Sequence, residues 1–435
     1  MYHYIGTAHR DAILGYRYSS TDQSLLSRYV LGPYWNWLVT LFPTTIAPNT
    51  ITLLGLVLVL SNVISLLWLD PTLEHATASR RMLFEQRNDL LVVPLLYRYG
   101  NPSTGPAEYT PVLPPWLFYV WALCLFAYQS LDSIDGKQAR RTGMSGPLGE
   151  LFDHGCDALN TTFGCVLAMG ALGLGRSSIA LLIFVSSMAS FYLTTWEEYH
   201  THTLFLSAFS GPVEGILIVC ALFILSGAAS PLFFTTGVLR ILGIDDIAWA
   251  RENLASYNFS IGEVFAVGAA SGLFVNAFAA YGNVVRKCRE TNNSIYEPLI
   301  GLLPFVLQVC ANVSWAGGNG RMIFEYGPAY MPFIFFWGIS FAYLVGIVIV
   351  AHVTKVPFPH WNVTGVISVL GAIDANLPGG PIVQSTPAAT LRTVYAALAF
   401  ATAIYAYFVF DVIQAITHIS ASMLTSRQAV FPCRV

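Results

Sequence analysis

Apolar runs of about 20 residues recur along this chain, and a run of that length can cross a lipid bilayer as a helix. Hydrophobic residues make up 55% of the sequence and charged residues only 10%, whereas a soluble domain usually carries about 25% charged residues. The composition therefore excludes one large soluble core. It predicts an all-α polytopic membrane protein.

We expect nine membrane-spanning helices, or ten if the shorter apolar segment 363–374 also crosses the membrane. The nine spans cover about residues 50–69, 114–131, 147–174, 177–195, 212–229, 259–284, 296–316, 329–352 and 393–416. The connection 230–258 is mixed in composition, and no element is assigned to it.

The residues before the first span divide into two parts. Residues 1–21 are polar and are expected to lie in water. The following stretch, Asp22 to Phe42, is rich in aromatic residues but is interrupted by Gly32-Pro33, too broken for a full span. Because Trp and Tyr favour the membrane–water interface, it is predicted to be an interfacial amphipathic helix. The alternative is a soluble lid helix.

Four aspartates, Asp132, Asp135, Asp153 and Asp157, lie between two predicted spans in the stretch 131–160. Carboxylates this close to hydrocarbon are costly unless something compensates them, and ionisable residues within membranes are functional by default. The members of each pair are three or four residues apart, so both carboxylates of a pair share one helix face. This stretch is therefore predicted to be an active site, the alternative being solvated carboxylates at helix ends.

The two aspartate pairs are expected to face each other across a helical hairpin. Gly143 is suited to end the first helix, and Gly146-Pro147 is suited to start the second. At 1.5 Å per residue, Asp135 lies about 12 Å from Gly143 and Asp153 lies about 9 Å from Pro147. The two pairs would thus sit at similar depths.

Four converging carboxylates without a soft ligand suit Mg²⁺, Mn²⁺ or Ca²⁺ rather than zinc. They can share two ions, which is the arrangement used for in-line attack at phosphorus. Gly136, Ala139 and Gly149 would let a phosphate or nucleotide approach the backbone. Arg140 can pair with phosphate oxygens in a forked contact. The pattern favours a site for a phosphorylated or nucleotide-linked substrate.

Composition excludes other classes of site and partner. The seven cysteines form no CxxC pair, which argues against a disulfide framework or a zinc knuckle. The net charge of −3 is close to neutral and indicates no nucleic-acid partner.

The order of these residues resembles the signature of the CDP-alcohol phosphotransferase family at every fixed position. The matching residues are Asp132, Asp135, Gly136, Ala139, Arg140, Gly149, Asp153 and Asp157. The flanking sequences DGKQARRT, DHGCD and APNTITLLG resemble the eukaryotic cholinephosphotransferase and ethanolaminephosphotransferase branch. The signature covers only about a tenth of the chain, while the length and the many predicted spans are also similar to that branch.

The resemblance implies transfer of phosphocholine, phosphoethanolamine or both from CDP-choline or CDP-ethanolamine to diacylglycerol, with release of CMP. The four aspartates would hold two ions, Mg²⁺ or Mn²⁺. The residues implied to bind the nucleotide are Asn49, Asp132, Gly136, Ala139, Arg140 and Gly149. The preference between choline and ethanolamine, and between the two metals, stays open.

The lipid hydroxyl must lose a proton, and two residues are candidates for the general base. Asp157 is the base usually proposed for the wider family. His154 belongs to the DHGCD sequence of the branch, and its ordinary pKa suits a base near neutral pH. We favour His154 because a carboxylate bound to metal is a poor base, although His154 points about 100° around the helix from Asp153.

The choline or ethanolamine headgroup would favour aromatic faces and nearby acids. The candidates for this role are Tyr128, Trp196, Glu198 and Glu214. Aromatic residues are also abundant at membrane interfaces for other reasons. These four residues are therefore hypotheses for the headgroup site.

Three regions are expected along the chain. Residues 1–46 form the tail and interfacial helix, residues 47–229 the catalytic membrane core, and residues 230–435 the later helices, for lipid access and a homodimer interface. The resemblance implies residence in the endoplasmic reticulum or Golgi. Lys137, Arg140 and Arg141 would place the active site in the cytosol by the positive-inside rule. A second basic turn at 286–289 is expected on the same side, whereas arginines in the loop 70–113 point the other way.

Three other functions remain open at this stage. The protein could be another CDP-alcohol transferase, or an intramembrane prenyltransferase that holds a diphosphate with Mg²⁺ on aspartate-rich helices. The alternative that is not an enzyme is a cation transporter with carboxylates along its path. Arg140 and the glycines fit a transporter badly.

Overall fold

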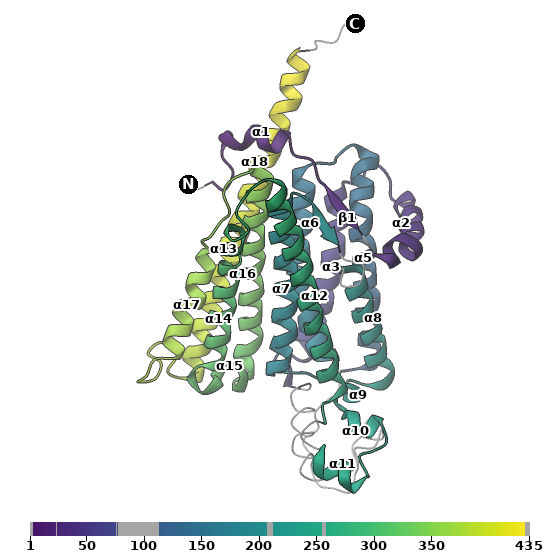
Figure 1. Cartoon of the computed structure of the whole chain (residues 1–435), viewed down its shortest axis with the longest axis vertical. Helices are drawn as coiled ribbons and strands as arrows, with labels where there is room; N and C mark the ends of the chain where they lie inside the picture. The colour runs from purple at the N-terminus through teal and green to yellow at the C-terminus, as the bar shows by residue number, and fades with distance from the viewer. Residues whose placement is uncertain are drawn as a thin grey trace.

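The computed structural model describes residues 3–22, 24–74, 76, 113–206, 212–254 and 258–430, with side chains described up to residue 421. Within these ranges nearly all regular structure is helical, so the all-α polytopic fold is confirmed (Figure 1). The segments long and apolar enough to cross a membrane are α3 (Pro48–Leu69), α5 (Pro115–Thr142), α7 (Ser178–Thr201), α12 (Ile261–Glu290), the pair α13 (Glu297–Ile300) and α14 (Leu303–Gly317), α16 (Gly327–Thr354) and α18 (Pro387–Val430).

Each of these segments coincides with a predicted span. Two shorter apolar helices, α8 (Pro212–Ala229) and α17 (Val363–Ala375), also lie at predicted positions, as does the more polar helix α6 (Pro147–Ala171). The helix α17 has 13 residues, or about 20 Å at 1.5 Å per residue, which is shorter than the hydrocarbon core of a bilayer.

Short elements connect the long helices. They are the helical turns Thr7–His9, Ser27–Leu31, Val39–Leu41 and Asn319–Arg321, the helices α1 (Arg10–Leu14), α2 (Gly32–Leu38), α9 (Leu232–Thr235), α10 (Val238–Ile241), α11 (Ala248–Asn253) and α15 (Met322–Glu325), and the strands β1 (Ser20–Asp22) and β2 (Leu204–Leu206). The connection 230–258, to which the sequence assigned nothing, thus contains α9 to α11 where it is described. The loop 70–113 is described only at its ends, so its arginines lie outside the described residues.

The hairpin of α5 and α6 forms at the residues that predicted it. The helix α5 ends at Thr142 and is followed by Gly143, whose φ of +69° is a left-handed conformation that glycine adopts without a steric penalty. The helix α6 starts at Pro147 after an extended Gly146. Proline fits this position because the first helical residues have no intrahelical partner for their N–H groups.

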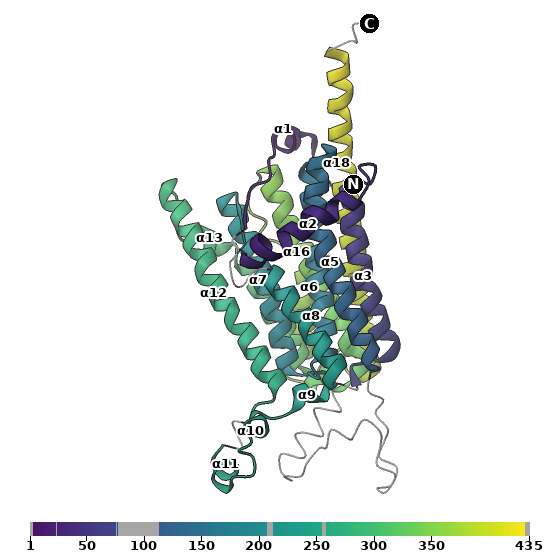
Figure 2. The same ribbon diagram turned by 90° about the vertical axis from the view of Figure 1, so that its right-hand side faces the viewer.

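The helix α16 is the most buried of the long helices and contacts α6, α7 and α18. The pairs α3–α5, α5–α8 and α7–α12 also pack along much of their length. Figure 2 shows α12 inclined relative to the other long helices, and most of its apolar side chains are exposed or half-buried in the isolated chain (Figure 2). This exposure is expected of a helix that faces lipid.

The segment before the interfacial helix differs from its prediction. We call residues 3–22 the N-terminal strap. Residues 1–21 were expected to lie in water, and β1 is indeed exposed. However, Ile5 and Ile13 are buried in the main core. The strap also pairs in parallel with the chain after α7, with Ser20 opposite Leu204. The prediction of a water-exposed tail therefore holds for most residues of the strap but is wrong at Ile5 and Ile13, which dock it on the bundle.

The aromatic stretch that follows the strap forms η2 (Ser27–Leu31), α2 and η3 (Val39–Leu41). The predicted interruption at Gly32-Pro33 does not occur, because the backbone stays helical through Leu31 and Gly32. Its Leu31, Trp35 and Val39 pack against the ends of α3 and α5, while Tyr29 and Trp37 are exposed. Figure 2 shows α2 lying across the long helices rather than along them. This arrangement is consistent with the predicted interfacial helix.

Candidate active site

The two helices of the hairpin bring the predicted aspartates together. Asp132 lies on α5, and Asp153 and Asp157 lie on α6. One carboxylate oxygen from each of these three residues lies within 4.8 Å of the others. All three side chains are partly buried. Three of the four aspartates that were expected to converge therefore lie together, and Asp135 is not part of this group.

Neighbouring helices hold these aspartates in place. Thr52 on α3 donates a hydrogen bond from Oγ1 to Oδ2 of Asp135, at 2.5 Å. Tyr128, one turn before Asp132, donates its hydroxyl hydrogen to Oδ1 of Asp157. A Cβ at Gly55 would lie only 3.1 Å from the Tyr128 ring. The close approach of α3 to α5 at Gly55 therefore fixes the tyrosine.

The aspartate cluster fits a divalent cation. Oδ1 of Asp132 and Oδ1 of Asp153 are buried without a hydrogen-bond partner in the described part of the chain. Buried carboxylate oxygens without a partner are costly, and a hard cation compensates them directly. An all-carboxylate donor set suits Mg²⁺ or Mn²⁺ better than zinc.

The residues predicted to bind the nucleotide lie beside the aspartates. A Cβ added to Gly149 would lie 3.9 Å from Oδ1 of Asn49, and one added to Gly136 would lie 3.7 Å from Nη1 of Arg140. Both are ordinary contact distances. Internal packing thus does not require glycine at either position, which leaves the approach of a ligand as a reason for it.

Two consecutive arginines at the end of α5 have different surroundings. Arg141 donates to the backbone oxygens of Val39 and Phe42 and so ties η3 to the hairpin. Arg140 is exposed, and no hydrogen bond or ion pair of its side chain occurs among the described residues. Arg140 therefore has its guanidinium available for a ligand.

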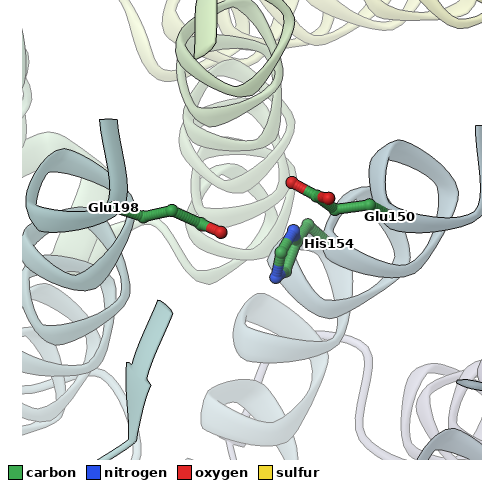
Figure 3. Close-up of side chains that lie close together, drawn as sticks. All are labelled: Glu150, His154 and Glu198. Atoms are coloured by element: carbon green, nitrogen blue, oxygen red, sulfur yellow. The ribbon is translucent and has the colours of Figure 1, made fainter. Parts of the chain in front are cut away.

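A second buried polar cluster lies on an adjacent face of α6. It consists of Glu150 and His154 on α6 and Glu198 on α7, with one donor atom of each within 4.8 Å of the others (Figure 3). All three residues are less than 10% exposed. Figure 3 shows Glu198 reaching from α7 toward the two α6 side chains. This spacing could also accommodate a metal ion, but it places a base candidate between two acids.

The side chains of the second cluster form few hydrogen bonds and no salt bridge to Lys or Arg within the described residues. Nδ1 of His154 and Oε1 of Glu150 are buried and have no hydrogen-bond partner among the described residues. Oε2 of Glu150 accepts a hydrogen bond from the hydroxyl of Tyr16, which lies on the N-terminal strap. No Lys or Arg forms a salt bridge with either glutamate in the described ranges.

The four headgroup candidates do not lie together. Tyr128 contacts the aspartate cluster and Glu198 belongs to the second cluster. Trp196 is 1% exposed and donates from Nε1 to the backbone oxygen of Pro298, at 2.8 Å. Glu214 accepts a hydrogen bond from Ser24, just after the strap.

The sequence analysis did not identify Glu150, which belongs to the second cluster, or Tyr16, which contacts it. Glu150 lies one turn before His154, so helical spacing could have identified it as a neighbour of the base candidate. Tyr16 carries no such signal, because it is one of four tyrosines in a polar segment and lies 134 residues from Glu150.

An apolar cavity of about 420 Å³ lies between α6, α16 and α18. Leu159, Phe335 and Leu398 are among the residues that line it. Tyr405, also in its lining, donates a hydrogen bond to the backbone oxygen of Gly155, at 3.4 Å. The cavity is thus joined to the turn of α6 that carries His154.

Comparison with known proteins identifies relatives over most of the chain. The CDP-alcohol phosphatidyltransferase family pattern matches residues 111–246. A CDP-alcohol phosphatidyltransferase class-I family protein of Schizosaccharomyces pombe is 37% identical, with 83% of this chain and 82% of the relative covered.

Two named relatives extend this similarity. Choline/ethanolaminephosphotransferase 1 of Saccharomyces cerevisiae is 34% identical over 83% of this chain and 82% of its own length. Ethanolaminephosphotransferase 1 of Homo sapiens is 28% identical over 91% and 88%. The matched region contains the whole aspartate hairpin. The chain is therefore an integral membrane enzyme that belongs to the CDP-alcohol phosphatidyltransferase family.

Proposed function

We propose that this protein transfers phosphocholine, phosphoethanolamine or both from the CDP-alcohol to diacylglycerol, giving phosphatidylcholine or phosphatidylethanolamine and CMP. The observation that carries the proposal is the convergence of Asp132, Asp153 and Asp157 on a hairpin with the complete family motif. Relatives named for choline and ethanolamine phosphotransfer are similar over about four fifths of the chain.

Asp132, Asp135, Asp153 and Asp157 would hold two divalent ions, Mg²⁺ or Mn²⁺. The partnerless buried oxygens and the all-carboxylate donor set support this assignment. Such ions, when bound, would neutralise the diphosphate and stabilise the departing CMP.

The nucleotide would lie against Asn49, Gly136, Ala139, Arg140 and Gly149. The absence of side chains at the two glycines would admit the diphosphate close to the backbone. Arg140 would form a forked contact with phosphate oxygens. This residue set orients the phosphorus toward the space between α5 and α6.

His154 would accept the proton of the diacylglycerol hydroxyl. Asp157 is less suited to this role because it accepts a hydrogen bond from Tyr128 and would also bind metal. Glu150 and Glu198 flank the imidazole and would stabilise the imidazolium that forms. The proton is thus removed on one face of α6, while phosphate is bound on the neighbouring face.

Of the four headgroup candidates, Tyr128 and Glu198 are the two that we place beside the headgroup. Tyr128 and Glu198 border the two clusters and can reach a headgroup next to the transferred phosphate. Trp196 donates a hydrogen bond to Pro298, and one oxygen of Glu214 accepts a hydrogen bond from Ser24. An ammonium would be attracted by the carboxylate of Glu198 and the ring of Tyr128.

The later helices would admit and hold the lipid acceptor. The apolar cavity lies between α6 of the predicted catalytic region 47–229 and two helices of the predicted region 230–435. Its volume and its apolar lining suit part of an acyl chain. The outer faces of these later helices would also form the interface of a homodimer.

The active site would face the cytosol, in the endoplasmic reticulum or Golgi membrane. Lys137 lies near the hairpin turn, and the basic end of α12 lies at the same end of the bundle, where Asn283 contacts Glu197. Both basic segments would therefore lie on the cytosolic side.

The test is an assay of the purified full-length protein with diacylglycerol and labelled CDP-choline or CDP-ethanolamine, with and without Mg²⁺ or Mn²⁺. The expected result is metal-dependent formation of labelled phospholipid and stoichiometric CMP. The Asp153→Asn variant is the matched control for background activity.

Other outcomes identify the alternatives. Turnover of a prenyl diphosphate without cytidine dependence would favour the prenyltransferase. Cation flux across liposomes without CMP release would favour the transporter. Use of a different CDP-alcohol alone would keep the chemistry and replace the substrate.

A further inference from the structure

The N-terminal strap crosses the end of the bundle at which the second cluster lies. Near its start, Nδ1 of the His3 ring lies 2.6 Å from Oδ1 of Asp411 on α18, within hydrogen-bond distance. The hydroxyl groups of Tyr4 and Tyr343 lie 3.1 Å apart, which joins the strap to α16. At its other end, β1 pairs with β2 directly after α7. The strap is therefore attached on both sides of the site.

Tyr16 is the point at which the strap enters the site. Its hydroxyl donates to Oε2 of Glu150, and its ring packs edge-on against His352 of α16, with centroids 5.8 Å apart. Burial, and next the nearby charge of Glu150, raise the pKa of the Tyr16 hydroxyl far above its usual value. The hydroxyl thus remains protonated and remains a donor at any pH at which the enzyme would be assayed.

Glu150 depends on this one donor. It is 8% exposed, its other oxygen has no partner among the described residues, and no cation is paired with it there. A buried carboxylate with a single hydrogen bond can rotate or become protonated when that bond is lost. The hydroxyl of Tyr16 therefore decides where the second oxygen of Glu150 points.

We propose that Tyr16 is a positioning residue of the active site. By holding one oxygen of Glu150, it keeps the other beside the imidazole of His154, so that the strap completes the proton-accepting cluster. The inference rests on the proposed base role of His154. The aspartate cluster lies on another face of α6, so binding of the CDP-alcohol does not depend on Tyr16.

The test compares Tyr16→Phe with Tyr4→Phe in the full-length protein. Both variants remove one phenolic hydroxyl from the strap and keep the ring, but the Tyr4 hydroxyl contacts Tyr343 rather than the cluster. Tyr16→Phe is expected to lower kcat roughly tenfold or more, the effect of one hydrogen bond to a charged group, while the KM for the CDP-alcohol is unchanged. Tyr4→Phe is expected to keep the wild-type kcat.

A double-mutant cycle with Glu150→Gln supplies a readout that a structural role would not affect. If Tyr16 acts through Glu150, its removal has little further effect in the Glu150→Gln background. Thermal unfolding of each variant in the same detergent is expected to remain cooperative and above the assay temperature, with at most the small loss of stability that one hydrogen bond contributes. This measurement separates lost positioning from lost folding.

Three results would overturn the inference. The first is a wild-type kcat for Tyr16→Phe, and the second is additive effects of the two substitutions. The third is a rise in the KM for the CDP-alcohol alone, which would mean that Tyr16 contacts the CDP-alcohol. A wild-type protein with no transferase activity would instead refute the proposed function. An active wild type with an unaffected Tyr16→Phe variant refutes only the role of Tyr16.

Discussion

The two polar clusters on α6 are built from the same helix but in different ways. The aspartate cluster joins α5 and α6, whose connection is a short turn, and its residues follow helical spacing. The second cluster joins α6 to Glu198 on α7 and, through Glu150, to Tyr16 on the strap. The first is a local structure and the second depends on tertiary assembly. We infer a corresponding division of chemistry, with phosphate and metal binding on one face and proton removal on the other.

Removing an aspartate is expected to have the largest effect. Asp153→Asn should reduce transfer by on the order of a thousandfold or more, because metal ions supply several kcal/mol of transition-state stabilisation. It should also weaken binding of labelled CDP-choline, measured by equilibrium binding in the presence of Mg²⁺. If the variant binds CDP-choline normally but no longer transfers the headgroup, Asp153 would act in proton removal. The proposed division of chemistry between the two clusters would then be wrong.

Removing the candidate base should leave binding of the CDP-alcohol unchanged. His154→Ala is expected to lower kcat by about 100- to 10,000-fold, the usual contribution of general base catalysis, with the KM for the CDP-alcohol nearly unchanged. Steady-state kinetics at several donor concentrations separates the two constants. If transfer remains at the wild-type rate, Asp157 becomes the preferred base.

A smaller loss is expected when one flanking acid becomes neutral. Glu198→Gln keeps the shape of the side chain but removes its charge, and we expect kcat to fall about 10- to 100-fold, since a hydrogen bond to a charged group contributes about 1.5–3 kcal/mol. Assays with both donors also test the headgroup role. A change confined to the KM for one CDP-alcohol would assign Glu198 to headgroup binding instead of proton removal.

The smallest effect is expected from Trp196, which neighbours Glu197 and Glu198 in sequence but faces away from both clusters. Trp196→Phe removes the hydrogen bond to Pro298, so the free energy of unfolding should fall by about 1 kcal/mol. The ratio of activity with CDP-choline to activity with CDP-ethanolamine should not change. A shift in that ratio would return Trp196 to the headgroup site.

The hairpin and its aspartates could be predicted because the signals are local. Gly143 and Pro147 mark the turn by backbone chemistry, and spacings of three and four residues place carboxylates on one helix face. Apolar run length similarly predicted the positions of the long helices. Such signals do not depend on which helix packs against which.

Docking of the N-terminal strap was not predicted because composition measures average polarity. Ile5 and Ile13 are two apolar residues in a polar segment, yet both are buried against the bundle. Their burial depends on a complementary surface formed by other helices, among them α16 and α18. A sequence window contains no information about that surface.

The sequence by itself determined the membrane class, the helical hairpin, the aspartate cluster and the family, since each follows from apolar length, turn chemistry or residue spacing within one short stretch. Only the tertiary structure decided that His154 lies between Glu150 and Glu198, that Trp196 faces elsewhere, and that Tyr16 reaches Glu150. The physical reason is that a contact between distant segments is set by the packing of whole helices. Packing decides which buried polar groups from distant segments meet, and no local pattern specifies those meetings in advance.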